Sequence, residues 1–176
     1  MWPDRRLIEL FGIEYPLVQA PMAGAMDGAL AAEVSAAGGL GSLPCALLTA
    51  EQIRAEVEKI RRRTAKPFNL NFFCHTPPEL NNAREAAWRD RLAPYYREYG
   101  LDPSQPAPSS LRMPFDAKLC ALVEELKPRV ASFHFGLPAP ELVARVKRAG
   151  CVVVSSATTV AEARWLEARG VDAIIA

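Results

Sequence analysis

The segment Pro16-Leu-Val-Gln-Ala-Pro-Met-Ala-Gly-Ala-Met-Asp-Gly28 combines a short apolar run, a tight turn and a helix start. Pro21 cannot donate to a sheet ladder, so it marks the end of a strand that we predict at Leu17–Ala20. Asp27 can cap a following helix, which we predict at Gly28–Ala37. In α/β proteins, ligands bind at the carboxyl ends of strands, where such turns lie. From propensity alone, a ligand-binding turn and a plain structural turn fit this segment equally well.

The same strand-then-helix unit recurs along the chain. Cys151–Val154 is continuously apolar, which indicates a strand buried on both faces and therefore a parallel sheet. Three predicted helices end in glycine just before a strand, at Gly38, Gly150 and Gly170. With the first strand, we predict six: Leu17–Ala20, Leu40–Leu43, Pro67–Phe73, Val130–Phe135, Cys151–Ser155 and Val171–Ile175. Six strands fit an open doubly wound sheet or part of a (β/α)8 barrel, which needs eight strands.

Residues 74–115 interrupt this rhythm and are predicted to be a helical, proline-rich insertion. We predict a helix over Glu79–Leu92 that Pro94 breaks or restarts. Leu101–Pro114 contains four prolines and is predicted to be a surface loop. Because the insertion follows a strand directly, it leaves the sheet at the carboxyl end of that strand. A lid over a site and a passive surface excursion are both compatible with this position.

The bulk composition is that of a globular domain of 176 residues with a formal net charge of +1. Arg61-Arg-Arg63 is the one basic cluster, and its place in the last turn of a predicted helix indicates a solvated helix end rather than nucleic-acid binding. No apolar stretch approaches the ~20 residues of a membrane span, and no secretory leader is apparent. The four cysteines form no C-x-x-C pair, so we expect neither a metal site nor disulfides, and a cytoplasmic location.

Gln19-Ala-Pro-Met-Ala-Gly24, followed by Ala36-Ala-Gly-Gly-Leu-Gly-Ser42, resembles the opening of the nitronate monooxygenase family. Supporting matches extend over nearly the whole chain, at Pro67–Phe73, Val130–Gly136 and Gly170–Ala176. The resemblance implies a fold of the (β/α)8 TIM-barrel type, incomplete as given, with about six of the eight strands. It also implies FMN as the cofactor.

The resemblance further implies a reaction. In this family the flavin accepts an electron from a bound alkyl nitronate, and O2 completes the oxidation to a carbonyl compound and nitrite. One alternative is an FMN-dependent enoyl-thioester reductase that uses NAD(P)H. A second alternative is a truncated, inactive fragment that binds another subunit. The implied partners are a small-molecule substrate, O2 and a second chain or further copy that completes the barrel.

Flavin contacts are expected at two strand ends. The resemblance assigns Ala20, Pro21, Met22 and Ala23 to the flavin, mainly through their backbone groups. Asn71 lies within an apolar strand, where a buried amide needs hydrogen-bond partners. It matches the asparagine of the family pattern better than Asn69 does, although neighbouring backbone groups would satisfy it equally well.

His134 is the catalytic candidate, since it lies near the end of a strand and histidine titrates near neutrality. A packed core histidine is the competing interpretation. Ser155 and Ser156 follow the next strand and are expected either to contact the cofactor or to cap a helix. The histidine usually assigned to catalysis in the family, and its flavin phosphate loops, correspond to positions beyond Ala176. We therefore expect residues 1–176 alone to be inactive.

Overall fold

The computed structural model describes residues 2–79, 81–102, 104–105 and 112–176. The chain divides into two compact units, the first made of Met1–His75 and Leu111–Ala176 and the second of Thr76–Ser110. The second unit falls within the insertion predicted at about 74–115.

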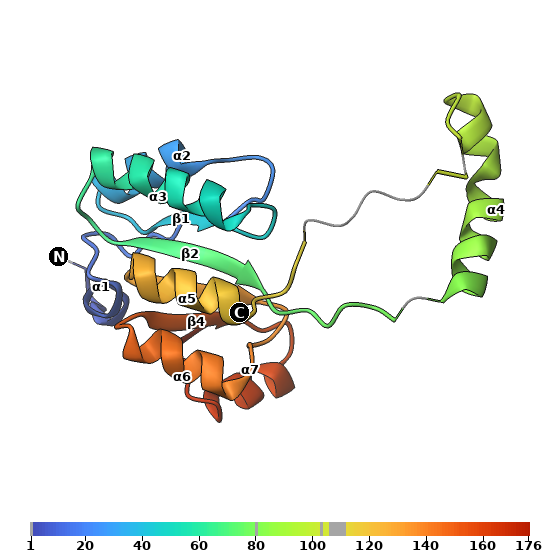
Figure 1. The fold of residues 1–176 in the computed structure, drawn as a ribbon. Helices are drawn as coiled ribbons and strands as arrows, with labels where there is room; N and C mark the ends of the chain where they lie inside the picture. The colour runs from blue at the N-terminus through green and yellow to red at the C-terminus, as the bar shows by residue number, and fades with distance from the viewer. Residues whose placement is uncertain (1, 80, 103, 106–111) are drawn as a thin grey trace. The chain divides into compact units, whose positions relative to one another are not determined.

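The first unit is built on a parallel sheet whose five strands are paired in chain order. The strands are β1 (Gly41–Pro44), β2 (Phe68–Phe73), β3 (Val130–His134), β4 (Val152–Ser156) and β5 (Ala173–Ile175). Each parallel pair is joined by a crossover that contains a helix: α3 (Ala50–Arg63) before β2, α5 (Ala117–Leu126) before β3, α6 (Pro140–Arg148) before β4 and α7 (Val160–Glu167) before β5 (Figure 1). The helix α2 (Gly28–Ala36) precedes β1. Consecutive βα units with sequential strand order are the repeat of a (β/α)8 fold. The parallel α/β prediction is confirmed.

The first predicted strand, Leu17–Ala20, is wrong as a full strand. It forms a single parallel bridge, Val18 to Leu40, supported by Gln19 N–H donating to Leu40 O at 3.0 Å. Pro16 and Pro21 bracket the segment, and proline has no N–H with which to extend a ladder. The sheet therefore has five strands plus this bridge rather than six strands.

The helices begin where local side chains satisfy free backbone N–H groups. They are α1 (Arg6–Phe11), α2 (Gly28–Ala36), α3 (Ala50–Arg63), α5 (Ala117–Leu126), α6 (Pro140–Arg148) and α7 (Val160–Glu167). Asp27 caps α2 by accepting from Ala29 N–H, and Thr49 with Gln52 forms a capping box at the start of α3.

Only half of a capping box forms at the start of α7. Thr159 Oγ1 accepts from Glu162 N–H at 3.1 Å. The Glu162 carboxylate, however, accepts from the backbone N–H and the hydroxyl of Thr158 instead of from Thr159. These donors, the backbone N–H first, lower the pKa of Glu162.

The two faces of the sheet have different partners. One face packs against α3, α5 and α6 in the main core, through residues such as Leu70, Phe133 and Val153. On the opposite face, here called the inner face, Leu40, Val130, Val152 and Val154 form a smaller cluster with Phe11 of α1. Side chains along a strand alternate between the two faces of the sheet. Once one residue of a strand is placed on a face, the face of every other residue of that strand follows.

The second unit contains the helix α4 (Asn82–Glu98), capped by Asn81, which accepts from Arg84 N–H at 2.9 Å. Pro94 lies inside this helix, so the prediction that it breaks or restarts the helix is wrong. A proline removes one backbone hydrogen bond, and in a helix without buried residues water can satisfy the freed carbonyl. None of the described helices has the length and apolar character needed to cross a membrane.

All four cysteines are free thiols, and burial raises the pKa of each. The pKa of Cys74 is raised to about 12 and that of Cys151 to about 11. Because only thiolates react, we expect Ellman's reagent at pH 8 to modify none of them rapidly in the folded chain. The same titration in denaturant should count four thiols. A thiol that reacts rapidly before unfolding would contradict this burial.

Candidate functional site

Strand register brings polar side chains together at the carboxyl half of the inner face. Asn71 of β2 is paired with Ser132 of β3, and the next inner-face pair is Phe73 with His134. On β4, Ser156 follows Val154, the register partner of Ser132, by two residues and lies on the same face. The inner face thus changes from apolar near α1 to polar near the carboxyl ends of the strands.

Two amides and two hydroxyls form a buried network on this face. Asn69 Nδ2 donates to Ser42 Oγ at 3.1 Å and to Ser132 Oγ at 2.9 Å. Asn71 Nδ2 donates to the same Ser132 Oγ at 2.9 Å. Asn69 Oδ1, by contrast, is buried and accepts no hydrogen bond from the described residues. An unsatisfied buried acceptor costs about 1–3 kcal/mol, so this atom is a candidate ligand contact.

Asn69, which carries this orphan oxygen, is one of the residues that line a pocket of about 440 Å³, here called the inner pocket. Ser132, Gln19 and Asn69 are its polar side chains, and no charged side chain lines it. Val18 and Ala20 from the first bridge segment line it together with Ile174 and Ile175 of β5. These segments lie at opposite ends of the strand order, so the sheet curls about the pocket as a barrel wall does.

The predicted flavin-binding turn only partly reaches this pocket. Ala20 and Pro21 line it, whereas Met22 and Ala23 are exposed and do not. Asn71 does not line the inner pocket either. Its side chain donates to Ser132, which does line the pocket, and the asparagine among the lining residues is Asn69.

Gln19 is a pocket residue that sequence reasoning missed. Its Oε1 accepts from Ser42 N–H at 3.1 Å, and its Nε2 donates to Met26 Sδ at 3.0 Å. It thereby ties the turn after the bridge segment to β1. A long amide inside an otherwise apolar run was the signal that could have revealed it, as it did for Asn71.

His134, at the end of β3, lies beside a second cavity of about 650 Å³. Its Nδ1 is 2.5 Å from Ser156 Oγ, and both side chains line this cavity with Thr158, Glu162 and Trp165. The imidazole also lies against Phe135 and Phe73, with ring centroids 3.9 and 5.9 Å away. His134 is therefore half-buried at the strand end, as a catalytic group in a barrel would be.

Ser155 lies on the helix-covered face and is fully buried, so it does not reach the inner pocket. Its Oγ is 3.1 Å from Phe133 O and 2.9 Å from Gly136 O, both of which accept from its hydroxyl. These contacts hold the loop in which Phe135 has a φ of 66°. A bulky residue in this left-handed region stores about 1–3 kcal/mol, and such strain collects near functional sites.

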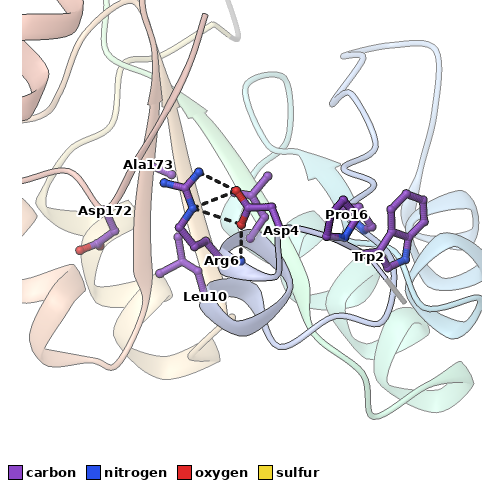
Figure 2. Close-up of a pocket in the computed structure, with 9 residues that line it drawn as sticks. Trp2, Asp4, Arg6, Leu10, Pro16, Asp172 and Ala173 are labelled. Carbon is purple, nitrogen blue, oxygen red and sulfur yellow. Dashed lines mark hydrogen bonds and ion pairs between the residues drawn. The ribbon is translucent and has the colours of Figure 1, made fainter.

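A further cavity, of about 520 Å³, lies at the other end of the sheet (Figure 2). It is bounded by α1, Trp2, and Asp172 and Ala173 at the start of β5. Figure 2 shows Arg6 paired with Asp4, with Nη2 to Oδ2 at 2.6 Å. Barrel enzymes place catalysis at the carboxyl ends of strands, so this cavity is not the candidate active site. The described residues also contain no cluster of three or more metal-ligating side chains.

The sequence model of the nitronate monooxygenase family matches residues 4–176. The chain belongs to this family. It is 45% identical to a nitronate monooxygenase of Paraburkholderia phytofirmans over 98% of this chain and 47% of that protein. It is 42% identical to a nitronate monooxygenase of Pseudomonas aeruginosa, over 97% of this chain and 49% of that protein. The chain thus spans about half the length of the curated relatives it matches.

Solved structures show the same fold. A nitroalkane oxidase from Streptomyces ansochromogenes superposes with a TM-score of 0.82 at 38% identity, covering 97% of this chain and 48% of that one. FabK from Thermotoga maritima superposes with a TM-score of 0.70 at 27% identity, covering 97% and 43%. These neighbours are TIM-barrel enzymes, so the resemblance to a partial (β/α)8 fold is confirmed.

Members of the nitronate monooxygenase family use a flavin cofactor. The inner pocket fits the ring portion of such a group: Val18, Val130 and Val154 give apolar walls, and the orphan Asn69 Oδ1 needs a donor. A flavin ring edge carries an N–H donor that would satisfy it. The pocket has no side chain that would neutralise a phosphate.

Proposed function

We propose that this chain carries the ring-binding half of an FMN-dependent nitronate monooxygenase that oxidises alkyl nitronates with O2 to carbonyl compounds and nitrite. The observation that carries the proposal is the unsatisfied Asn69 Oδ1 in the curled wall of the inner pocket. Membership of the family supports the reaction class. When bound, the flavin would supply the electron-accepting centre for the nitronate.

The residues of the chain have separate tasks in this proposal. Asn69 and Ser132 orient the ring through the amide–hydroxyl network, and Gln19 fixes the turn of Ala20 and Pro21 against it. The valines exclude water from the ring. His134, which lines the second cavity at the end of β3, binds the nitronate.

The surroundings of the site complete the proposal. β5 is paired only with β4 among the described strands, so we propose that its other edge pairs with further strands that complete the barrel. Four free thiols are consistent with a reducing cytoplasm, which we propose as the location.

The test of function is anaerobic reduction of the flavin bound to an intact homologue built on this sequence, because residues 1–176 alone are expected to be inactive. We expect the nitronate of 2-nitropropane to bleach the flavin absorbance and air to restore it with release of nitrite. If NAD(P)H bleaches the flavin absorbance instead, and an enoyl thioester then reoxidises the flavin, the reductase alternative is favoured. A flavin that responds to neither reagent would support the inactive-fragment alternative.

The uncharged inner pocket leads to a prediction about flavin selectivity. Riboflavin and FMN share the ring, and the pocket lining offers no cation to the phosphate. We therefore expect residues 1–176 to bind the two with Kd values within about threefold of each other, whereas a charge-assisted phosphate site gives roughly 30-fold or more. Fluorescence titration of both flavins measures the ratio. A strong preference for FMN would reveal a phosphate site outside the inner pocket.

A further inference from the structure

The contact between His134 and Ser156 determines more than the position of the imidazole. Ser156 Oγ lies 2.5 Å from His134 Nδ1 and has no other hydrogen-bond partner among the described residues. Neutral imidazole has one donor and one acceptor nitrogen, so the role of this hydroxyl sets the tautomer.

The two possible roles differ in what they leave unsatisfied. If Nδ1–H donated to Ser156, the hydroxyl hydrogen of this half-buried serine would have no acceptor among the described residues. If the hydroxyl donates to Nδ1, both groups are satisfied. We infer that Ser156 holds neutral His134 in the Nε2–H tautomer, so that Nε2 donates a hydrogen bond to an oxygen of the nitronate. This inference rests on the proposed function and makes Ser156 a positioning residue.

Neighbouring groups restrict the ring in this orientation. Ser155, one residue earlier on β4, holds the Phe135–Gly136 loop through Gly136 O at 2.9 Å. The rings of Phe135 and Phe73 contact the imidazole on its other sides. The end of β4 therefore sets both the position and the tautomer of His134, through two adjacent serines on opposite faces of the sheet.

The tautomer has a consequence for the form of the substrate. A nitronate has already lost its α proton and carries negative charge on its oxygens, so it needs a donor and no base. A neutral nitroalkane would need a free nitrogen lone pair to take its α proton. With Nε2 protonated, His134 favours binding of the nitronate anion over binding of the neutral nitroalkane.

The tautomer is directly measurable, because the chain contains only two histidines. In chain labelled with 15N-histidine, at a pH where both rings are neutral, we expect the His134 multiplet to show Nε2–H and unprotonated Nδ1. His75→Gln assigns the two spectra. Ser156→Ala should produce a mixture of tautomers, and Ser156→Thr, which keeps the hydroxyl, should restore the single form. An Nδ1–H tautomer in the unmodified chain would overturn the inference.

A second experiment measures how the tautomer affects binding of the substrate. We expect Ser156→Ala to weaken binding of the 2-nitropropane nitronate about fivefold, the effect of one neutral hydrogen bond, and Ser156→Thr to restore it. His134→Gln, whose amide nitrogen can replace Nε2–H, should bind better than His134→Asn. Equal affinity of the Ala and Thr variants would overturn the inference. If the unmodified chain shows the Nε2–H tautomer but binds no nitronate, the proposed function fails and the tautomer assignment stands.

Discussion

Gly41→Ala should largely prevent the first unit from folding. A Cβ at Gly41 would lie 1.9 Å from Ala31 O and 2.6 Å from Ser35 Oγ, because α2 rests directly on β1. Neither group can move aside at low energetic cost. Ala31 O belongs to the helix backbone, and Ser35 Oγ accepts from Gly41 N–H and donates to Pro67 O. We expect the free energy of unfolding to fall by about 3 kcal/mol or more, as measured by urea denaturation followed by circular dichroism.

The matched control for this substitution is Gly150→Ala. Gly150 has a φ of 90°, but a Cβ there would meet no atom within 4 Å. Its cost should be only the left-handed backbone penalty of about 1–2 kcal/mol. Equal losses for the two variants would mean that α2 and β1 are not in the close contact described here.

Asn69→Asp should produce the second large effect, through charge alone, because the two side chains have almost the same shape. Asn69 is 3% exposed and no charged side chain among the described residues lines the inner pocket, so a carboxylate at this position would be buried without a cationic partner there. We expect a loss of roughly 3 kcal/mol at pH 8. Burial raises the pKa of an introduced carboxyl above its unfolded value, so the neutral acid is tolerated. The lost stability should therefore return as the pH falls through the raised pKa towards 4.

Urea midpoints at pH 4 and pH 8 measure this effect against the unmodified chain. Asn81→Asp is the matched control, because Asn81 is an exposed helix N-cap where aspartate serves equally well. It should change the midpoint little at either pH. A variant at position 69 that is equally stable at both pH values would show that water reaches the amide network.

The sequence predicted the types of residue in the candidate site and their place at strand ends, but not which of them line the pocket. Histidine and serine at strand ends, and an amide inside an apolar strand, were visible in the sequence because strands place ligand-binding groups at their carboxyl ends. Which asparagine faces the pocket was not visible. Asn69 and Asn71 share a face, and only the curl of the sheet decides that Asn69 lines the pocket while Asn71 supports it through Ser132.

The sequence by itself determined the features that depend on near neighbours. The order of βα units, the caps at Asp27 and Thr49 and the family relationship follow from residues within a few positions of each other. Tertiary structure decided the features that depend on contacts between distant segments: which face of the sheet Ser155 and Ser156 each occupy, the 2.5 Å contact of Ser156 with His134, and the space that only glycine fits at position 41. Local sequence sets backbone preferences, whereas contacts between segments tens of residues apart fix which atoms meet.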